Sequence, residues 1–166
     1  MTTQDAVDEI RQELLRLYPD LDTEAFGVIG RILRLARDIQ SRRARQLATF
    51  DLTPADFDVL ATMRRKGADG INPGTLLQSL LITSGGLTKR LDRLEGFGLI
   101  ERQPDPDDRR GTLLRLTEEG ANRIDGAIPS LLQEEAELLR PALNRRHLEE
   151  TASLLRRLML EVPKEA

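Results

Sequence analysis

The sequence contains no cysteine, no tryptophan and a single histidine, His147. Without cysteine the chain can form no disulfide, no thiolate metal site and no cysteine nucleophile, and it has no thiol with which to sense peroxide. We therefore predict no metal site, and we expect no cofactor. Aromatic residues make up only 3% of the chain, so its core must consist mainly of Leu, Ile, Val and Ala, which favours helices.

Long hydrophobic runs are also absent. No apolar stretch approaches the roughly 18 residues needed to span a bilayer. Residues 1–20 lack the basic and apolar segments of a signal peptide, and we expect a cytoplasmic protein. With 39% hydrophobic and 32% charged residues, the 166-residue chain is typical of one globular domain with its own core.

Acidic and basic residues are separated along the chain, whose net charge is −3. Residues 1–26 carry seven acids against two arginines, whereas residues 27–50 carry six arginines against one acid. Residues 117–166 carry ten acids against seven bases. A basic patch can therefore exist on a protein whose total charge is negative, which leaves nucleic acid open as a partner.

Apolar residues recur at helical spacing through most of the chain. This spacing predicts helices over residues 4–17, 24–48, 53–67 and 117–139, and a last helix that Asn144 caps. Between them, a short helix opens at Asn72, and a tight turn separates it from another helix over residues 83–97.

The two short helices form a predicted helix-turn-helix. One face of the second helix carries Leu87, Leu91 and Leu94. Its other face carries small and polar residues, namely Ser84, Gly85, Thr88, Lys89 and Asp92. Small residues let a helix backbone approach phosphates and base edges, while hydroxyl and ammonium groups supply donors. The same residues could also begin an ordinary surface helix.

Two brief strands, "LIER" and "TLLRL", are predicted on either side of the charged loop at 104–111. An isolated hairpin of this kind could be only a solvated turn. Directly after a candidate recognition helix, it is typical of a wing, and Arg109 and Arg110 could then reach the minor groove. Asp108 is close enough in sequence to brace the Arg110 guanidinium with a charge-assisted hydrogen bond.

Both ends of the chain carry long amphipathic helices that one small winged helix cannot cover. Burial against a second copy, at about 25 cal/mol per Å², predicts a homodimer, although the helices could also fold back on their own domain. We thus expect a mainly α, winged helix-turn-helix protein with a small β-hairpin. Its dimerisation helices would lie at 1–50, including an extension at 4–17, and at 118–166, around a DNA-binding lobe at 51–117.

The segment "DPDDRRGTLLRLT" following "TSGGLTKRLDRLEGFGLIER" resembles the multiple antibiotic resistance regulator (MarR) family of bacterial transcription factors, over residues 24–160. The resemblance implies a homodimeric regulator, most often a repressor, on a palindromic double-stranded operator. It implies that Ser84, Thr88 and Lys89 contact the major groove and phosphates. Arg110 and Arg109 would enter the minor groove with Asp108 as the brace, and Arg93 would support the wing or contact phosphate.

The resemblance also implies a small effector, commonly an aromatic or phenolic anion bound between the dimer helices and the DNA-binding lobe. One branch of the family responds to urate and carries an extra N-terminal helix, and "PDLD" followed by "FDVLATMRRKG" is similar to that branch. Its ligand residues match Asp58, Arg90 and Arg102. The branch also uses a Trp in the leading helix, where this chain has no Trp and Leu14 stands near the place.

Two other classes of function are alternatives to operator binding. A winged-helix dimer that binds a protein would have the same sequence features, but it would lack steeply salt-dependent duplex binding. An enzyme has little support, because the sequence shows no nucleophile–His–acid set, no phosphate-binding Gly loop and no metal-ligand spacing.

Overall fold

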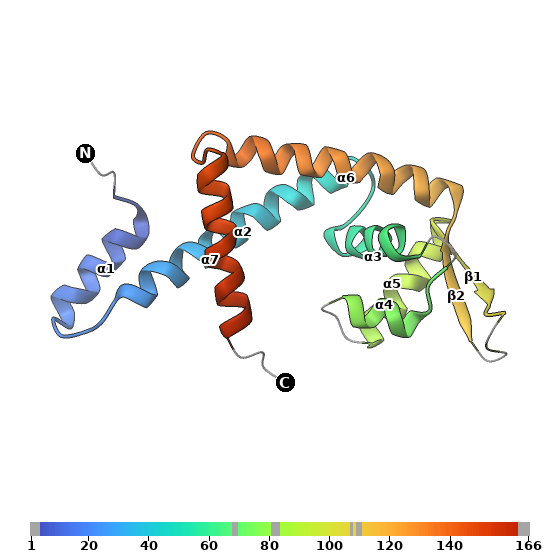
Figure 1. Ribbon diagram of the computed structural model, residues 1–166, viewed down its shortest axis with the longest axis horizontal. Helices are drawn as coiled ribbons and strands as arrows, with labels where there is room; N and C mark the ends of the chain where they lie inside the picture. Colours follow the sequence, from blue (N-terminus) through green and yellow to red (C-terminus); the bar gives the residue numbers. More distant parts are fainter. Residues whose placement is uncertain (1–3, 68–69, 81–83, 107, 109–110, 163–166) are drawn as a thin grey trace. The chain divides into compact units, whose positions relative to one another are not determined.

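A computed structural model describes residues 4–67, 70–80, 84–106, 108 and 111–162 (Figure 1). Within these residues it contains seven helices and one antiparallel hairpin, which confirms the predicted fold class. In chain order the elements are α1 (Ala6–Leu17), α2 (Glu24–Ala48), α3 (Pro54–Lys66), α4 (Pro73–Ser79), α5 (Ser84–Gly96), β1 (Ile100–Pro104), β2 (Thr112–Leu116), α6 (Glu118–Leu139) and α7 (Arg145–Glu161).

The chain divides into two compact units, Met1–Pro54 and Ala55–Ala166. The three-part division at residues 50 and 117 stays a prediction. None of the helices that the structure describes is long and apolar enough to span a bilayer.

In the first unit, α1 packs on the start of α2. Asp5 caps α1, and its side chain forms a reciprocal capping box with Asp8. Val7 is only 2% exposed and lies against Gly30, where an added Cβ would be 3.2 Å from it. Arg31 of α2 binds both carboxylates of this capping box, at 2.8 Å from Asp5 and 2.8 Å from Asp8. The glycine allows the two helices to approach closely, and the arginine fixes the beginning of α1.

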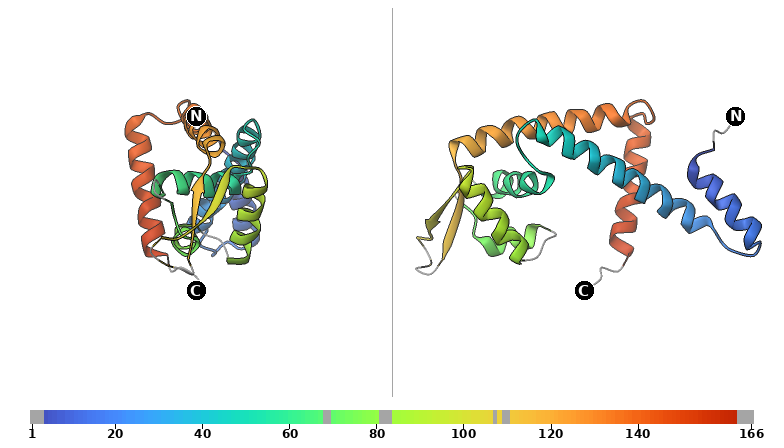
Figure 2. Two further views of the ribbon diagram at one scale, coloured as in Figure 1. Left: turned by 90° about the vertical axis from the view of Figure 1, so that its right-hand side faces the viewer. Right: turned by 180° about the vertical axis from the view of Figure 1, so that it is seen from behind.

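The core of the second unit lies where α3, α4, α5, the hairpin and α6 meet. Figure 2 shows α3, α4 and α5 grouped beside the hairpin. Each of the following apolar residues is at most 4% exposed: Val59, Leu60, Met63, Ile71, Leu76, Leu87, Leu91, Leu94, Leu99, Ile100, Leu114, Ile124, Ala127 and Leu131. Full burial of one such large side chain contributes about 1.5–3 kcal/mol, so these residues set how the helices and hairpin pack.

The hairpin is in regular antiparallel register, from Ile100 opposite Leu116 to Pro104 opposite Thr112. The first strand continues two residues beyond the predicted segment at 99–102. Leu114 also pairs with Ile71, which precedes α4, through two backbone hydrogen bonds of 3.0 and 2.9 Å. The wing is therefore attached by its inner half to the helix-turn-helix.

Hydrogen bonds hold the start of α6 against residues 98 and 99, which lead into β1. The Thr117 hydroxyl accepts the Gly120 N–H at 3.0 Å and donates to the Gly98 carbonyl at 2.6 Å. A Cβ added to Gly120 would lie 1.9 Å from the Leu99 carbonyl oxygen. Only glycine can occupy position 120 with this backbone packing.

Candidate nucleic-acid interface

The two helices of the predicted helix-turn-helix are α4 and α5. Asn72 precedes α4 and its side chain accepts the Thr75 N–H at 2.8 Å, while Pro73 takes the first helical position. One face of α5 is buried against the core through Leu87, Leu91 and Leu94. The predicted pair of helices is thus present, and residues 81–83 of the predicted turn lie outside the described residues.

The opposite face of α5 is exposed. Gly85, Thr88, Lys89 and Asp92 lie on it, and a Cβ added to Gly85 would meet nothing within 4 Å. Lys89 makes no hydrogen bond or ion pair within the described part of the chain, so its ammonium can take an anion. Ser84 is the first residue of α5, and its side chain lies outside the described part. The 13 residues of α5 extend roughly 20 Å, enough to follow one major groove.

A tight loop joins β1 to β2. The Asp105 N–H donates to the Gly111 carbonyl at 3.2 Å, and the Gly111 N–H donates to the Asp108 carbonyl at 2.8 Å. A Cβ on Gly111 would lie 2.9 Å from that of Asp105, so the loop closes in this form only with glycine there. Arg109 and Arg110 lie outside the described residues, and so does the predicted brace between Asp108 and Arg110.

Arg102 connects this hairpin to α5. It projects from β1, its Nη2 lies 2.7 Å from Asp92 Oδ1, and its Nη1 donates to Glu95 Oε2. Sequence reasoning missed this junction. The available signal was a pair of acids three residues apart on the predicted recognition helix, but their partner on a strand follows from the packing of the hairpin.

Arg93 connects α5 to α3. Its Nη2 lies 3.4 Å from Asp56 Oδ2, and its guanidinium lies over the Phe97 ring, 5.3 Å from the centroid. The Asp56 side chain is 3% exposed, so this ion pair is partly removed from water. The predicted role of Arg93 in wing support or phosphate contact remains a prediction.

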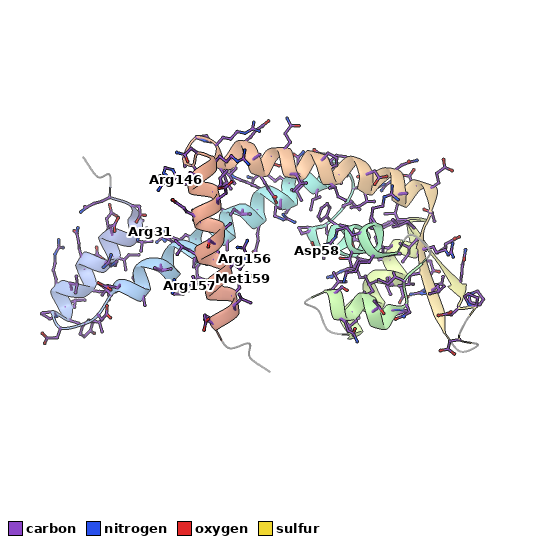
Figure 3. The ribbon with its side chains drawn as sticks, in the orientation of Figure 1. Arg31, Asp58, Arg146, Arg156, Arg157 and Met159 are labelled. Atoms are coloured by element: carbon purple, nitrogen blue, oxygen red, sulfur yellow. The ribbon has the colours of Figure 1, made fainter. Side chains whose placement is uncertain are left out.

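The predicted effector residues occupy different elements of the second unit. Asp58 extends from α3 and is exposed (Figure 3), and Arg90 is half-buried on α5. Within the described residues, no ion pair joins Asp58 to Arg90 or to Arg102. Arg102 is instead bound by the two carboxylates of α5.

The part of the chain that the structure describes contains no group of three His, Asp or Glu side chains placed to hold a metal ion. What it does contain is a pair of helices, α4 and α5, of which the second has an exposed face and is followed by a hairpin. This is a winged helix-turn-helix, the architecture of a class of DNA-binding proteins.

Comparison with known proteins identifies the family. Residues 50–111 match the model of the MarR family. The HTH-type transcriptional regulator PecS of Dickeya dadantii is 36% identical over 136 residues, which cover 81% of this chain and 82% of PecS. The chain therefore belongs to the MarR family of transcriptional regulators.

Solved structures of family members have the same fold. A variant of E. coli MarR in complex with operator DNA is 28% identical, with a TM-score of 0.69 over 87% of this chain and 96% of that one. The transcriptional repressor CouR, bound to a 23-mer DNA duplex, is 27% identical, with a TM-score of 0.71 over 84% of this chain and 99% of CouR. The fold of this chain is thus that of MarR-type regulators that bind DNA.

Proposed function

We propose that this protein is a sequence-specific repressor that binds a palindromic operator as a homodimer. The observation that carries the proposal is α5, whose buried leucines fix it on the core while Gly85, Thr88 and Lys89 face outward beside the hairpin. Ser84, Thr88 and Lys89 would contact the major groove and phosphates. Arg109 and Arg110, with Asp108 as a brace, would enter the minor groove.

Two exposed apolar surfaces support the homodimer. Five large apolar residues of α2 are 36–65% exposed, namely Phe26, Val28, Ile29, Leu33 and Leu35. In α7 no residue is buried, and five of its large apolar residues are 41–77% exposed, namely Leu154, Leu155, Leu158, Met159 and Leu160 (Figure 3 labels Met159). The same surfaces of a second copy would cover them in an isologous interface. The segments 1–50 and 118–166 would then form the dimerisation region around a DNA-binding lobe at 51–117.

A small aromatic or phenolic anion would release the repressor by favouring a dimer with wrongly spaced recognition helices. Arg90 has no carboxylate partner within the described residues, and Asp58 is exposed on α3. These two are our candidates for effector contacts. Arg102 is the third predicted effector residue and stays a prediction; its guanidinium binds two carboxylates of α5.

Fluorescence anisotropy with the duplex upstream of the protein's own gene tests the proposal. We expect two chains to bind per site with a steep salt dependence, on half-sites roughly 34–36 Å apart, and a scrambled duplex to bind weakly. Lys89→Ala should reduce the salt slope by about one, because one phosphate contact is lost. Arg146→Ala is the matched control, since it removes a cation that pairs with Glu150 on α7.

An unchanged slope for Lys89→Ala would contradict the phosphate contact. If the native chain bound neither this duplex nor any duplex selected from random DNA, operator binding itself would be wrong. A winged-helix dimer that binds another protein would then be the better hypothesis.

A further inference from the structure

One side chain ties the hairpin to the recognition helix. Arg102 leaves β1 and places its two terminal nitrogens on two carboxylates of α5, at 2.7 Å from Asp92 and in contact with Glu95. A guanidinium is a rigid planar fork, so binding both acids fixes its direction as well as its position. We infer that Arg102 is the positioning residue that sets the wing relative to the recognition helix, an inference that rests on the proposed function.

The place of Arg102 along the hairpin makes this effective. Arg102 is directly opposite Leu114, and Leu114 is the residue that pairs with Ile71 on the other side of β2. Both strands of the hairpin are therefore held at this residue pair: β2 by its backbone pairing with Ile71, and β1 by the Arg102 side chain. Two further residue pairs, ending with Pro104 opposite Thr112, extend beyond it toward the loop.

The hairpin acts as a lever beyond that level. Two residues of strand span roughly 7 Å, and Asp105 and Gly111, which are joined by a 3.2 Å hydrogen bond, lie beyond them. A small rotation at Arg102 would thus move the loop by more than the rotation moves the strand itself. Because hydrogen bonds and ion pairs to DNA depend on sub-ångström placement, loosening this point should weaken the contacts of the loop and leave those of α5 in place.

Arg102 also has an electrostatic effect that an experiment must separate from positioning. Asp92 is 60% exposed and lies on the same face of α5 as Thr88 and Lys89. An unpaired carboxylate there would repel phosphates, and Arg102 neutralises it. The three side chains of the cluster are 33–60% exposed, so the ion pairs contribute little to folding, and variants at these positions should fold.

The two effects predict opposite results for Asp92→Asn/Glu95→Gln. This double variant removes the partners of Arg102 and also two negative charges beside the DNA. If Arg102 acts only by neutralising these acids, the double variant should bind DNA more tightly. If Arg102 positions the wing, the double variant should lose the contacts of the wing with DNA. Arg102→Gln breaks the same contacts from the other side, and Arg145→Gln on α7 is the control for loss of one paired arginine.

Footprinting on the operator distinguishes the grooves. Protection of guanine N7 from dimethyl sulfate reports the major groove, and protection of the sugars from hydroxyl radicals reports the minor groove. At equal occupancy, we expect Arg102→Gln and the double variant to keep the protection of guanine N7. We expect both to lose the protection of the sugars where the wing contacts the DNA. Their affinity should fall about tenfold, the order of one specific arginine contact. The control should match the native chain in both.

Either of two results would overturn the inference. One is an unchanged minor-groove footprint together with tighter binding by the double variant, which would leave neutralisation as the whole role of Arg102. The other is a native complex that protects the major groove but not the minor groove, which would leave no wing contact to position. Operator binding would stand in both cases. Absence of any native footprint on operator or selected duplexes would instead refute the proposed function and this inference together.

Discussion

The guanidinium of Arg93 on α5 lies 3.4 Å from the carboxylate of Asp56 on α3, and the two side chains differ greatly in exposure. Asp56 is 3% exposed, whereas Arg93 is 48% exposed. A carboxylate withdrawn from water is costly unless charged or polar partners surround it. Arg93 supplies one such partner from the recognition helix, so the pair links the placement of α5 to a buried carboxylate of α3.

Arg93→Ala should lower the free energy of unfolding by roughly 1–2 kcal/mol in urea titrations, less than for a fully buried pair because Arg93 is half-exposed. Arg145→Ala, which removes a 93% exposed arginine paired with Glu149, should cost less than about 0.5 kcal/mol. Equal losses in the two variants would contradict a special role for the Asp56 pair. If Arg93 instead contacts a phosphate, Arg93→Ala should lower the salt slope of operator binding by about one.

Gly120 should be among the least replaceable residues of the chain. A Cβ there would lie 1.9 Å from the Leu99 carbonyl oxygen, and backbone on both sides prevents relief by a rotamer change. We expect Gly120→Ala to cost about 3 kcal/mol or more, or to abolish soluble expression. Gly96→Ala, at a position where a Cβ meets nothing within 4 Å, is the control and should be neutral or slightly stabilising. A native-like urea midpoint for Gly120→Ala would contradict the close approach.

Features that depend on neighbours in sequence were predictable. The start of α4 at Asn72 and Pro73 follows from local cap chemistry, and the structure has it. The leucines at 87, 91 and 94 face the core as their spacing indicated. A hairpin between two short apolar segments was also predicted, and β1 ends two residues later than expected.

Contacts between distant segments were not predictable in the same way. The pairing of Arg102 with Asp92 and Glu95 depends on which side of α5 the hairpin packs, and helical periodicity carries no such information. Gly120 gave no sequence signal, because its constraint is a carbonyl 21 residues earlier in the chain. The effector role of Arg102 follows from the family resemblance alone and stays a prediction.

The beginning of α1 carries a charged cluster with a defined pH response. The Asp8 N–H and the Arg31 guanidinium lower the pKa of Asp5 from its usual 3.8, and Arg31 followed by the Asp5 N–H lowers the pKa of Asp8. Carboxyl groups with lowered folded-state pKa values stabilise the folded state above the unfolded pKa. This contribution is lost as the pH falls through the lowered values, so α1 should be released in acid.

Hydrogen exchange of residues 6–17 should therefore accelerate relative to α5 as the pH falls from about 5 to about 3, after correction for intrinsic rates. Arg31→Gln should move this release to higher pH, because both carboxyl pKa values rise toward 3.8. Arg64→Gln breaks a comparable exposed pair with Asp125 in the other unit and should leave α1 unchanged. An identical pH profile for native and Arg31→Gln chains would remove Arg31 from the docking of α1.

The apolar stripe of α7 gives the sharpest test of the dimer. Leu155 and Met159 are one helical turn apart and exposed, and α7 has no buried residue, so Leu155→Glu/Met159→Glu should leave the chain folded. We expect a monomer by light scattering and loss of operator binding, because each chain supplies one recognition helix. Arg157→Glu changes the net charge by the same amount on the opposite side of the helix by its spacing, and it should remain dimeric. A dimer that survives the double substitution would show that the interface lies elsewhere, whereas loss of helical signal would show that α7 is needed for folding.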